Sequence, residues 1–512
     1  LNEPGRMLTA DSVAEISARV LEDGKSLDAG QADAAAAIAG TARLVTVTGP
    51  AGTGKTTLLK VAKAALEAQG RQLIAVAPTK KAASVVGREI GTTASSLHAL
   101  LLDHGWRWGV DSSGAQVWTL LQPGDYDPGR VDEHGRPVVY EGPRRFPLRA
   151  GDRIVVDEAG MVDLHTANAL AQLAEATGAG IAMVGDHLQA MPVGHSGAMA
   201  TMKNRSGAVV ELTAVHRFTD PEYGALSLRL REPANLQDAA AVAWALTGRG
   251  LVKTVRSQDE AREHMVTAYL QADAAGRRVS LVTSTNEEAQ QINDTIQAAL
   301  VDAGRLSDRV VAIGQNEQRL LLRDVVQTRR NDSGTGVENR ALWKIQEIRP
   351  DGVRLVSVTD SGDVKDVAAE YAADHVHLAY AATVHGIQGE TTDEAIVGPG
   401  VNAAGLYVGM TRGRDRNEAV VIAQSPQDAV DELAATMMRA RQEVTLEDAS
   451  RAALDELSRA ARPVDEPERE GLAPAVWSDR KRRPFGTIID LDQFAGDAPQ
   501  KATALREQLE QI

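Results

Sequence analysis

Eight consecutive residues, Gly49–Thr56, have the composition of a loop that binds phosphate groups. They fit the pattern G-x-x-x-x-G-K-[ST], with an apolar run before them and a helix-forming run after them. The glycines let backbone N–H groups converge on phosphates, Lys55 adds a positive charge, and Thr56 offers a hydroxyl to Mg²⁺. We expect ATP and Mg²⁺ here, with the nucleotide bound by Gly49, Gly52, Gly54, Lys55, Thr56 and Thr57.

A pair of acids, Asp157 and Glu158, follows the apolar run 154–156. Mg²⁺ bound to a nucleotide needs a carboxylate beside the phosphate loop, and Asp157 fits that role. Glu158 is then placed to polarise an attacking water, the step that separates an ATPase from a passive nucleotide binder. Alone, such a pair is more often a helix cap or a solvated turn, but the phosphate loop favours the catalytic interpretation.

The composition indicates a protein of several folded domains and excludes some kinds of chemistry. The chain has 512 residues, of which 43% are hydrophobic and 24% charged, so it is too long for one core and ordinary for folded domains. It has no cysteine, which excludes disulfides and thiol chemistry. A net charge of -15 means that any nucleic acid must bind in a locally basic groove.

The chain has no apolar run long enough to cross a membrane, and its first residues lack a secretory signal. Both observations predict a cytoplasmic protein. Because the first residue is Leu1, we expect an excised or processed chain with further domains upstream.

Strands and helices alternate in two regions, as in parallel sheets. In the first region the expected elements are a helix over 9–23 with Ser12 and Glu15 at capping-box spacing, strands 44–48, 72–77, 153–156 and 181–184, and helices 55–69, 80–89 and 97–102. In the second they are strands 279–283, 394–397 and 419–422 and a helix over 286–299.

Two segments interrupt this alternation. Residues 103–150 contain Trp106, Trp108 and Trp118 around a turn at 111–114, which predicts a projecting hairpin. The tryptophans would either pin the hairpin to its domain or stack bases where a duplex splits. Residues 305–380 contain short strands between turns, and their first part is basic, which predicts a small inserted β-barrel. The residues after 425 are acidic and predict helices that lead into a tail.

Further blocks follow the phosphate loop in a recognisable order. They are Gln31, 77–83 (APTKKAA), 185–194 (GDHLQAMPVG), 212–217 (LTAVHR), 380–390 (YAATVHGIQGE) and 407–412 (YVGMTR). This order across Gln31–Arg412 resembles the superfamily 1 helicases, and the Gly-Asp-x-x-Gln form at 185–189 resembles the 5′-to-3′ branch, superfamily 1B, which contains RecD-like and conjugative helicases. One departure is Ala190-Met191 after Gln189, where that family often has Leu.

The resemblance implies an α/β fold of two RecA-like P-loop domains, the first with the hairpin insertion and the second with an SH3-like β-barrel insertion. The expected parts are a helical lead-in over 1–26, a first domain over 27–205 (insertion 103–150), a second over 206–425 (insertion 305–380) and a C-terminal region over 426–512.

The resemblance also implies roles for single residues. Arg217 and Arg412 would reach the γ-phosphate from the second domain, so that hydrolysis requires domain closure. The implied catalytic residues are Lys55, Asp157, Glu158, Gln189, Arg217 and Arg412. Further nucleotide contacts are implied for Gln31, which would read adenine, and for Gln388, Gly389 and Glu390. Implied DNA contacts are Pro78, Thr79, Lys80, His98, Pro192, Val193, Thr383 and His385.

The implied function is an ATP-dependent 5′-to-3′ helicase that acts on single-stranded and partly duplex DNA. Asn331, Asn339 and Trp343 are closer to the helicase half of TraA/TrwC-type conjugative relaxases, which implies conjugation or recombination proteins as partners. The chain itself has no histidine triad and no paired tyrosines, so strand cleavage is not predicted. A relaxase would carry a histidine-cluster nuclease domain upstream.

Three alternatives stay open. A RecD-like recombination or repair helicase would share every motif. A P-loop small-molecule kinase is disfavoured because it needs neither the later motifs nor a second α/β domain. A scaffold without catalysis is disfavoured because the catalytic set is present.

Three other residues have ordinary explanations. His375 and His377 have metal-ligand spacing, but we expect a structural pair on one strand face. Trp343 fits a barrel core better than a stacking platform. His98 fits a core edge as well as a DNA contact.

Overall fold

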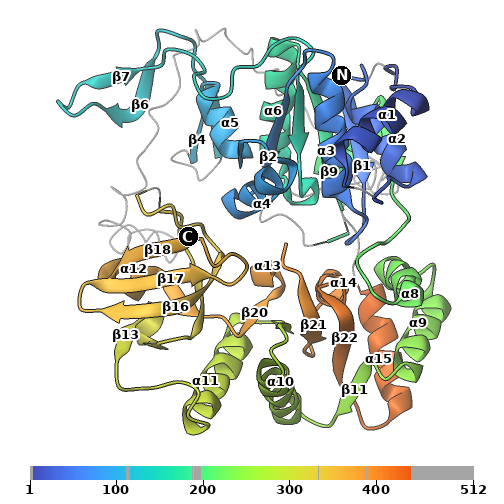
Figure 1. Cartoon of the computed structure of the whole chain (residues 1–512), viewed down its shortest axis with the longest axis vertical. Helices are drawn as coiled ribbons and strands as arrows, with labels where there is room; N and C mark the ends of the chain where they lie inside the picture. The colour runs from blue at the N-terminus through green and yellow to red at the C-terminus, as the bar shows by residue number, and fades with distance from the viewer. Residues whose placement is uncertain are drawn as a thin grey trace, which may run out of the picture. The chain divides into compact units, whose positions relative to one another are not determined.

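The computed structural model describes residues 4–22, 24–110, 116–186, 188–189, 198–332, 334–387 and 389–439. The chain forms two compact units. The larger runs up to Leu97 and resumes at Arg149, and the smaller contains His98–Leu148. The larger unit holds two parallel sheets, one in each α/β half (Figure 1).

The first half is built on a six-stranded parallel sheet with the order β10-β1-β9-β8-β2-β3. Its strands are β1 (Leu44–Thr48), β2 (Leu73–Ala77), β3 (Ala94–Ser96), β8 (Arg153–Val156), β9 (Gly180–Gly185) and β10 (Ala208–Glu211). β1, β2, β8 and β9 are buried along their full length, as expected of apolar runs covered on both faces. β10 lies parallel to β1, so the first half ends after Glu211 and not at residue 205 as expected.

Helices flank these strands, and four of them lie close to the predicted ranges 9–23, 55–69, 80–89 and 97–102. They are α1 (Ala10–Val20), α2 (Ala29–Ile38), α3 (Lys55–Glu67), α4 (Lys80–Ile90), α5 (Leu97–Asp103), α6 (Leu164–Thr177), α7 (Ala198–Asn204) and the 3-10 turn η1 (Ala159–Met161). The expected capping box at Ser12 and Glu15 is wrong. Thr9 caps α1, because its hydroxyl accepts a hydrogen bond from the Ser12 N–H at 3.3 Å.

The second half has a five-stranded parallel sheet with the order β11-β22-β21-β12-β20. Its strands are β11 (Val252–Val255), β12 (Val279–Thr283), β20 (Ala381–Thr383), β21 (Thr392–Val397) and β22 (Gly413–Ile422). Its helices are α8 (Pro221–Arg231), α9 (Leu236–Gly248), α10 (Gln258–Ala274), α11 (Asn286–Asp302), α13 (Val384–Ile387), α14 (Ala403–Gly409) and α15 (Pro426–Met438). α15 shares a core with α9, so this first part of the predicted C-terminal region belongs to the second half. The rest, from 440, lies outside the described residues.

A separate antiparallel sheet, β18-β17-β16-β15-β19, occupies the predicted insertion. The elements there are β13 (Val311–Ile313), η2 (Gln315–Glu317), β14 (Arg319–Leu321), β15 (Val325–Thr328), β16 (Leu342–Arg349), β17 (Gly352–Ser357), β18 (Val364–Ala368), α12 (Ala369–His375) and β19 (Val376–Leu378). Trp343 is 2% exposed and its Nε1 donates to the Thr328 hydroxyl at 3.3 Å, so it is a core residue.

The expectation that His375 and His377 share a strand face is wrong. His375 ends α12, and only His377 lies in β19. Arg329 and the Leu378 carbonyl contact the His377 ring nitrogens. Among the described residues, no group of three or more His, Asp or Glu side chains could hold a metal ion.

The smaller unit contains two antiparallel strand pairs, β4 (Trp106–Val110) with β5 (Gln116–Leu120) and β6 (Tyr126–Val131) with β7 (Pro137–Val139). The turn predicted at 111–114 lies outside the described residues. Trp108 stands opposite Trp118 with ring centroids 5.2 Å apart, and Trp106 packs on Trp118 at 6.3 Å. Arg107 is buried in an ion pair with Asp127. These contacts favour a packing role for the tryptophans.

Candidate active site

The loop between β1 and α3 leaves the start of the helix open. Gly54 occupies the N-cap position of α3 with φ 68°, and no side chain there accepts a hydrogen bond from the first N–H groups of the helix. The first turn contains no acidic residue. Backbone N–H groups and the positive end of the helix dipole therefore remain available to an anion. The Lys55 ammonium donates to the carbonyls of Gly49 at 2.7 Å and Pro50 at 3.2 Å, so it is folded over the same loop.

The Gln31 side chain forms a hydrogen bond to the backbone of this loop. Its side chain completes a capping box with Asp28 at the start of α2, and its Nε2 donates to the Thr53 carbonyl at 3.0 Å. Gln31 is only 4% exposed, and a Cβ on Gly54 would collide with its Nε2. The side chain holds the loop in shape, and its contact with adenine stays a prediction.

The two acids stand at the end of β8, in the same sheet as β1. Glu158 has φ 52°, a left-handed conformation that costs a non-glycine residue of order 1–3 kcal/mol. Burial and the adjacent Glu158 raise the pKa of Asp157 well above its usual value, while Lys55 opposes that shift. A cation beside Asp157 would stabilise its charged form, which fits the expected metal-binding role.

Two arginines approach the loop from later in the chain. Arg217 lies between β10 and α8, in the connection between the halves, which corrects its assignment to the second half. Its Nη1 donates to the Thr411 carbonyl at 2.6 Å. Arg412 follows α14 and is 2% exposed, with its Nε donating to the Val408 carbonyl at 2.9 Å. Burial lowers the pKa of both guanidinium groups, and the proximity of Arg412 lowers that of Arg217 further, to about 9.

These residues line one cavity of about 530 Å³ between the two halves. Several cations meet there without an equal number of acids, so the cavity suits an anionic molecule. The predicted residues that line it are Gly52, Gly54, Lys55, Thr56, Thr79, Asp157, Glu158, Gln189, Arg217, His385, Gly389 and Arg412.

Other predicted residues do not line the cavity. They are Gln31, Gly49, Thr57, Pro78, Lys80, His98, Thr383 and Glu390. His98 packs its ring against Trp108, with centroids 4.9 Å apart, in the smaller unit. Pro192, Val193 and Gln388 lie outside the described residues.

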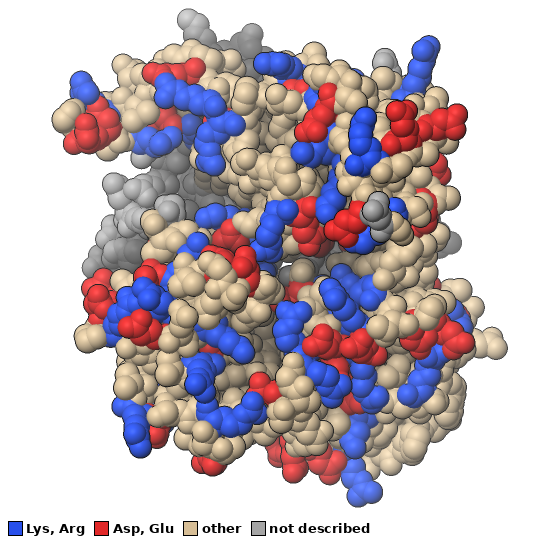
Figure 2. Space-filling model, in the orientation of Figure 1, with Lys and Arg blue, Asp and Glu red and all other residues tan. Residues whose placement is uncertain are grey.

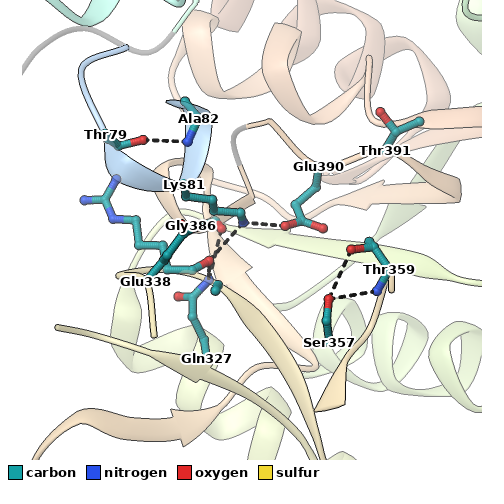
Figure 3. A network of polar contacts seen from close by, with 12 residues as sticks. Thr79, Lys81, Ala82, Gln327, Glu338, Ser357, Thr359, Gly386, Glu390 and Thr391 are labelled. Atoms are coloured by element: carbon teal, nitrogen blue, oxygen red, sulfur yellow. Dashed lines mark hydrogen bonds and ion pairs between the residues drawn. The ribbon is translucent and has the colours of Figure 1, made fainter. Parts of the chain in front are cut away.

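Sequence reasoning missed a polar network at one end of the cavity (Figure 3). Lys81, on α4, forms an ion pair with Glu390 and donates to the Arg340 carbonyl at 2.9 Å. Gln327 Nε2 donates to the carbonyls of Arg340 and Gly386, both at 3.1 Å, so the loop at 339–340 is fixed beside the segment at 384–390. Asn339 and Arg340 then line the cavity. No spacing rule predicts a contact between residues 309 positions apart.

Charges of both signs occur together on one face of the molecule. On the face shown in Figure 2, Lys and Arg side chains are interspersed with Asp and Glu. A polyanion that binds this face therefore depends on local basic contacts and not on one broad field. No described helix has the length and apolar character needed to span a membrane.

Most of the chain is similar in sequence to known proteins. A family described as an AAA domain matches residues 26–257. The conjugal transfer protein TraA of Agrobacterium fabrum is 25% identical over 383 residues, which cover 74% of this chain and 31% of TraA. The ATP-dependent RecD2 DNA helicase of Deinococcus radiodurans is 27% identical over 383 residues, which cover 73% of this chain and 46% of RecD2.

A solved structure shares the fold. Bacteroides Pif1 bound to single-stranded DNA has a TM-score of 0.50 and 18% identity, covering 84% of this chain and 98% of Pif1. The chain spans only about 31% of the length of the TraA proteins. Over about three quarters of its length, this chain is therefore similar in sequence to TraA and to the RecD2 helicase.

Proposed function

We propose that this chain is an ATP-dependent DNA helicase motor that moves 5′-to-3′ on single-stranded DNA and unwinds duplex. One observation carries the proposal: a single cavity joins the phosphate loop and the acids of the first half to Arg412 of the second. A site divided in this way works only when the halves approach each other, so hydrolysis depends on their relative position.

The residues present fit ATP and Mg²⁺. The open N-terminus of α3 and the Lys55 ammonium would hold the phosphates, and Thr56 with Asp157 would hold the metal, which neutralises phosphate charge when bound. The described residues contain no cluster that binds a metal alone, which fits an ion held together with the nucleotide.

Within that site, Glu158 would orient and polarise the attacking water. Arg217 and Arg412 would stabilise the charge that develops on the transferring phosphoryl group. Gln189 lines the cavity and donates to the Asp186 carboxylate at 3.4 Å, so it would lie close to the phosphates of a bound nucleotide. Nucleotide then favours a closed pair of halves, and alternating grip on a single strand turns closure into steps.

The DNA contacts are part of the proposal. Thr79 and His385 border the cavity from opposite halves, and Thr79 also caps α4 through the Ala82 N–H at 3.1 Å. DNA bound along this border would contact both halves and could therefore respond to closure. Lys80, Pro78, Thr383, Pro192 and Val193 complete the proposed path.

We also propose that the motor works in conjugative transfer, since the chain is similar to conjugal transfer proteins. A recombination or repair role is the alternative, supported by the similarity to RecD2. The antiparallel sheet at 305–380 would be an SH3-like insertion in the second half, and 103–150 would be a hairpin insertion in the first. The small-molecule kinase is not supported, because its chemistry leaves the second half and the similarity to RecD2 unexplained.

The test is ATP hydrolysis with and without single-stranded DNA, followed by unwinding of partial duplexes. We expect DNA to stimulate hydrolysis, and a duplex with a 5′ single-stranded tail to be unwound while one with only a 3′ tail is not. Lys55→Ala is the control and should weaken ATP binding. A rate of ATP hydrolysis that does not change when DNA is added would contradict the proposed motor function. Unwinding that requires a 3′ tail would contradict the proposed 5′-to-3′ polarity.

A further inference from the structure

A buried polar bridge connects the second half directly to the phosphate loop. Tyr407 lies on α14 and is 2% exposed. Its hydroxyl oxygen accepts a hydrogen bond from the backbone N–H of Ala51 at 3.0 Å, across 356 positions of sequence. Ala51 is itself only 4% exposed, so the bond is sheltered from water.

The same hydroxyl lies close enough to Asp186 for the acid to affect its ionisation. Burial raises the pKa of Tyr407, and the charge and hydrogen bonding of Asp186 raise it further. The hydroxyl therefore keeps its proton. Because the Ala51 N–H occupies a lone pair on its oxygen, the proton remains free to face Asp186.

Asp186 is fixed from the second half as well. Arg231, on α8, contacts both carboxylate oxygens, with Nη2 at 2.8 Å and Nε at 3.2 Å. Burial opposes the charge on Asp186, but Arg231 outweighs it and holds the pKa of the carboxyl below its usual value. The side chains of Asp186 and Arg231 are 0% and 11% exposed.

The bridge continues to the arginines of the active site. The Thr411 hydroxyl donates to the Tyr407 carbonyl at 2.9 Å, and the Thr411 carbonyl accepts the bond from Arg217. Arg412 follows directly and bonds back to the Val408 carbonyl. A displacement of Tyr407 would thus move the backbone that carries Arg412 and receives Arg217.

We propose that Tyr407 is a positioning residue, whose hydroxyl between Ala51 and the Asp186–Arg231 pair sets the distance from Arg412 to the phosphate loop. This role rests on the proposed ATPase function. It assigns to the hydroxyl a task separate from packing, since the aromatic ring alone would fill the same space.

Tyr407→Phe in the whole chain tests the proposal, because it removes one oxygen and keeps the ring. Small misplacements of reacting groups are costly, so we expect kcat for DNA-stimulated hydrolysis to fall about 10- to 100-fold. KM for ATP should change less than about threefold, because the groups that bind phosphate remain in place. A variant with unchanged kcat would overturn the proposal.

Tyr223→Phe is the matched control. Tyr223 is buried in the same core, but its hydroxyl donates to the Met410 carbonyl at 2.6 Å, so its bond stays within the second half. We expect its kcat to stay within about threefold of the original, with a similar loss of thermal stability. An equal fall of kcat in both variants would contradict the bridge.

A double variant shows whether Tyr407 acts through Arg412. In an Arg412→Ala background, Tyr407→Phe should lower kcat by less than about twofold, since residues that act through each other are not additive. A full additional loss would overturn the proposed route.

Hydrogen exchange separates this proposal from the helicase proposal. Without nucleotide, Tyr407→Phe should speed amide exchange in the peptide that contains Ala51, while Tyr223→Phe should not. Unchanged exchange would overturn the bridge even in an active enzyme. If the original protein did not hydrolyse ATP, the helicase proposal would fail, and faster exchange would still establish the contact.

Discussion

In each α/β half a helix follows the second strand from one edge of the sheet, β1 or β12, but the N-termini of the two helices differ. After β1, the chain reaches α3 through Gly54, which offers no side-chain cap and is followed by no acid in the first turn. After β12, Thr285 caps α11 by accepting from the Glu288 N–H, and Glu287 and Glu288 occupy the first turn.

The difference shows how one architecture gives one binding half and one non-binding half. In α11, the Thr285 hydroxyl accepts from one N–H group and carboxylates already complement the dipole, so a phosphate would find fewer donors and a less favourable field. In α3, both remain available. In the function proposed above, the second half instead contributes Arg412, which lines the same cavity as the loop of the first half. The proposed catalysis would therefore require both halves.

Removing Arg412 should lower the rate of ATP hydrolysis more than any other change considered. Arg412→Ala takes away the cation that the second half contributes, and we expect turnover to fall by roughly 10³-fold or more. ATP affinity should change less, because the first half binds the phosphates. The measurements are single-turnover hydrolysis and nucleotide titration. If only single-strand binding were lost while turnover stayed intact, Arg412 would be a DNA contact.

Glu158→Gln should have the next largest effect, within the first half. The amide keeps the shape of the side chain but cannot polarise water as a carboxylate does, so kcat should fall by about 10²-fold or more. Equilibrium binding of ATP should be retained. Near-normal DNA-dependent hydrolysis would remove Glu158 from the mechanism.

Alanine substitutions at the two N-cap positions test whether ATP binds at α3 and not at α11. Gly54→Ala places a side chain at φ 68°, against Gln31, and left-handed backbone costs a non-glycine residue about 1–2 kcal/mol, so ATP affinity should fall roughly tenfold or more. Thr285→Ala should cost about 1 kcal/mol of stability and leave ATP affinity unchanged. Nucleotide titration and urea unfolding measure the two effects. A loss of affinity in Thr285→Ala would contradict the assignment of binding to α3 alone.

The smallest expected effect is an acid sensitivity carried by the sheet inserted in the second half. Burial and Arg329 lower the pKa of His377 to about 4. The histidine is therefore protonated at a lower pH in the folded chain than in the unfolded chain. This contribution to stability is complete above pH 6.5 and is lost as the pH falls towards 4. Between pH 7 and 5.5 it amounts to about 1 kcal/mol. Urea unfolding of His377→Gln should show that much less pH dependence, and an identical pH profile would contradict the assignment.

The sequence predicted the parts whose signals are local. Gly49–Thr56 specifies a phosphate loop because glycine, lysine and threonine act at fixed short spacings, and the structure places that loop between β1 and α3. Trp343 was predicted to be a core residue because a lone Trp in a small barrel usually packs inside it, and its burial confirms this. The end of the first half was placed too early, because the short run at 208–211 does not reveal which sheet it joins.

Contacts between residues far apart in the chain could not be predicted, because they depend on how the elements pack. Tyr407 and Ala51, or Lys81 and Glu390, have no relation of spacing that a sequence pattern could detect. Their contacts arise because parallel sheets bring the carboxyl ends of their strands to one edge, and the two halves turn such edges towards a shared cavity. The chemical groups of the candidate site and the local conformation of the loop at 49–56 follow from short-range sequence alone. The distances between those groups follow from the packing of the two halves, since only packing fixes residues that the chain separates by hundreds of positions.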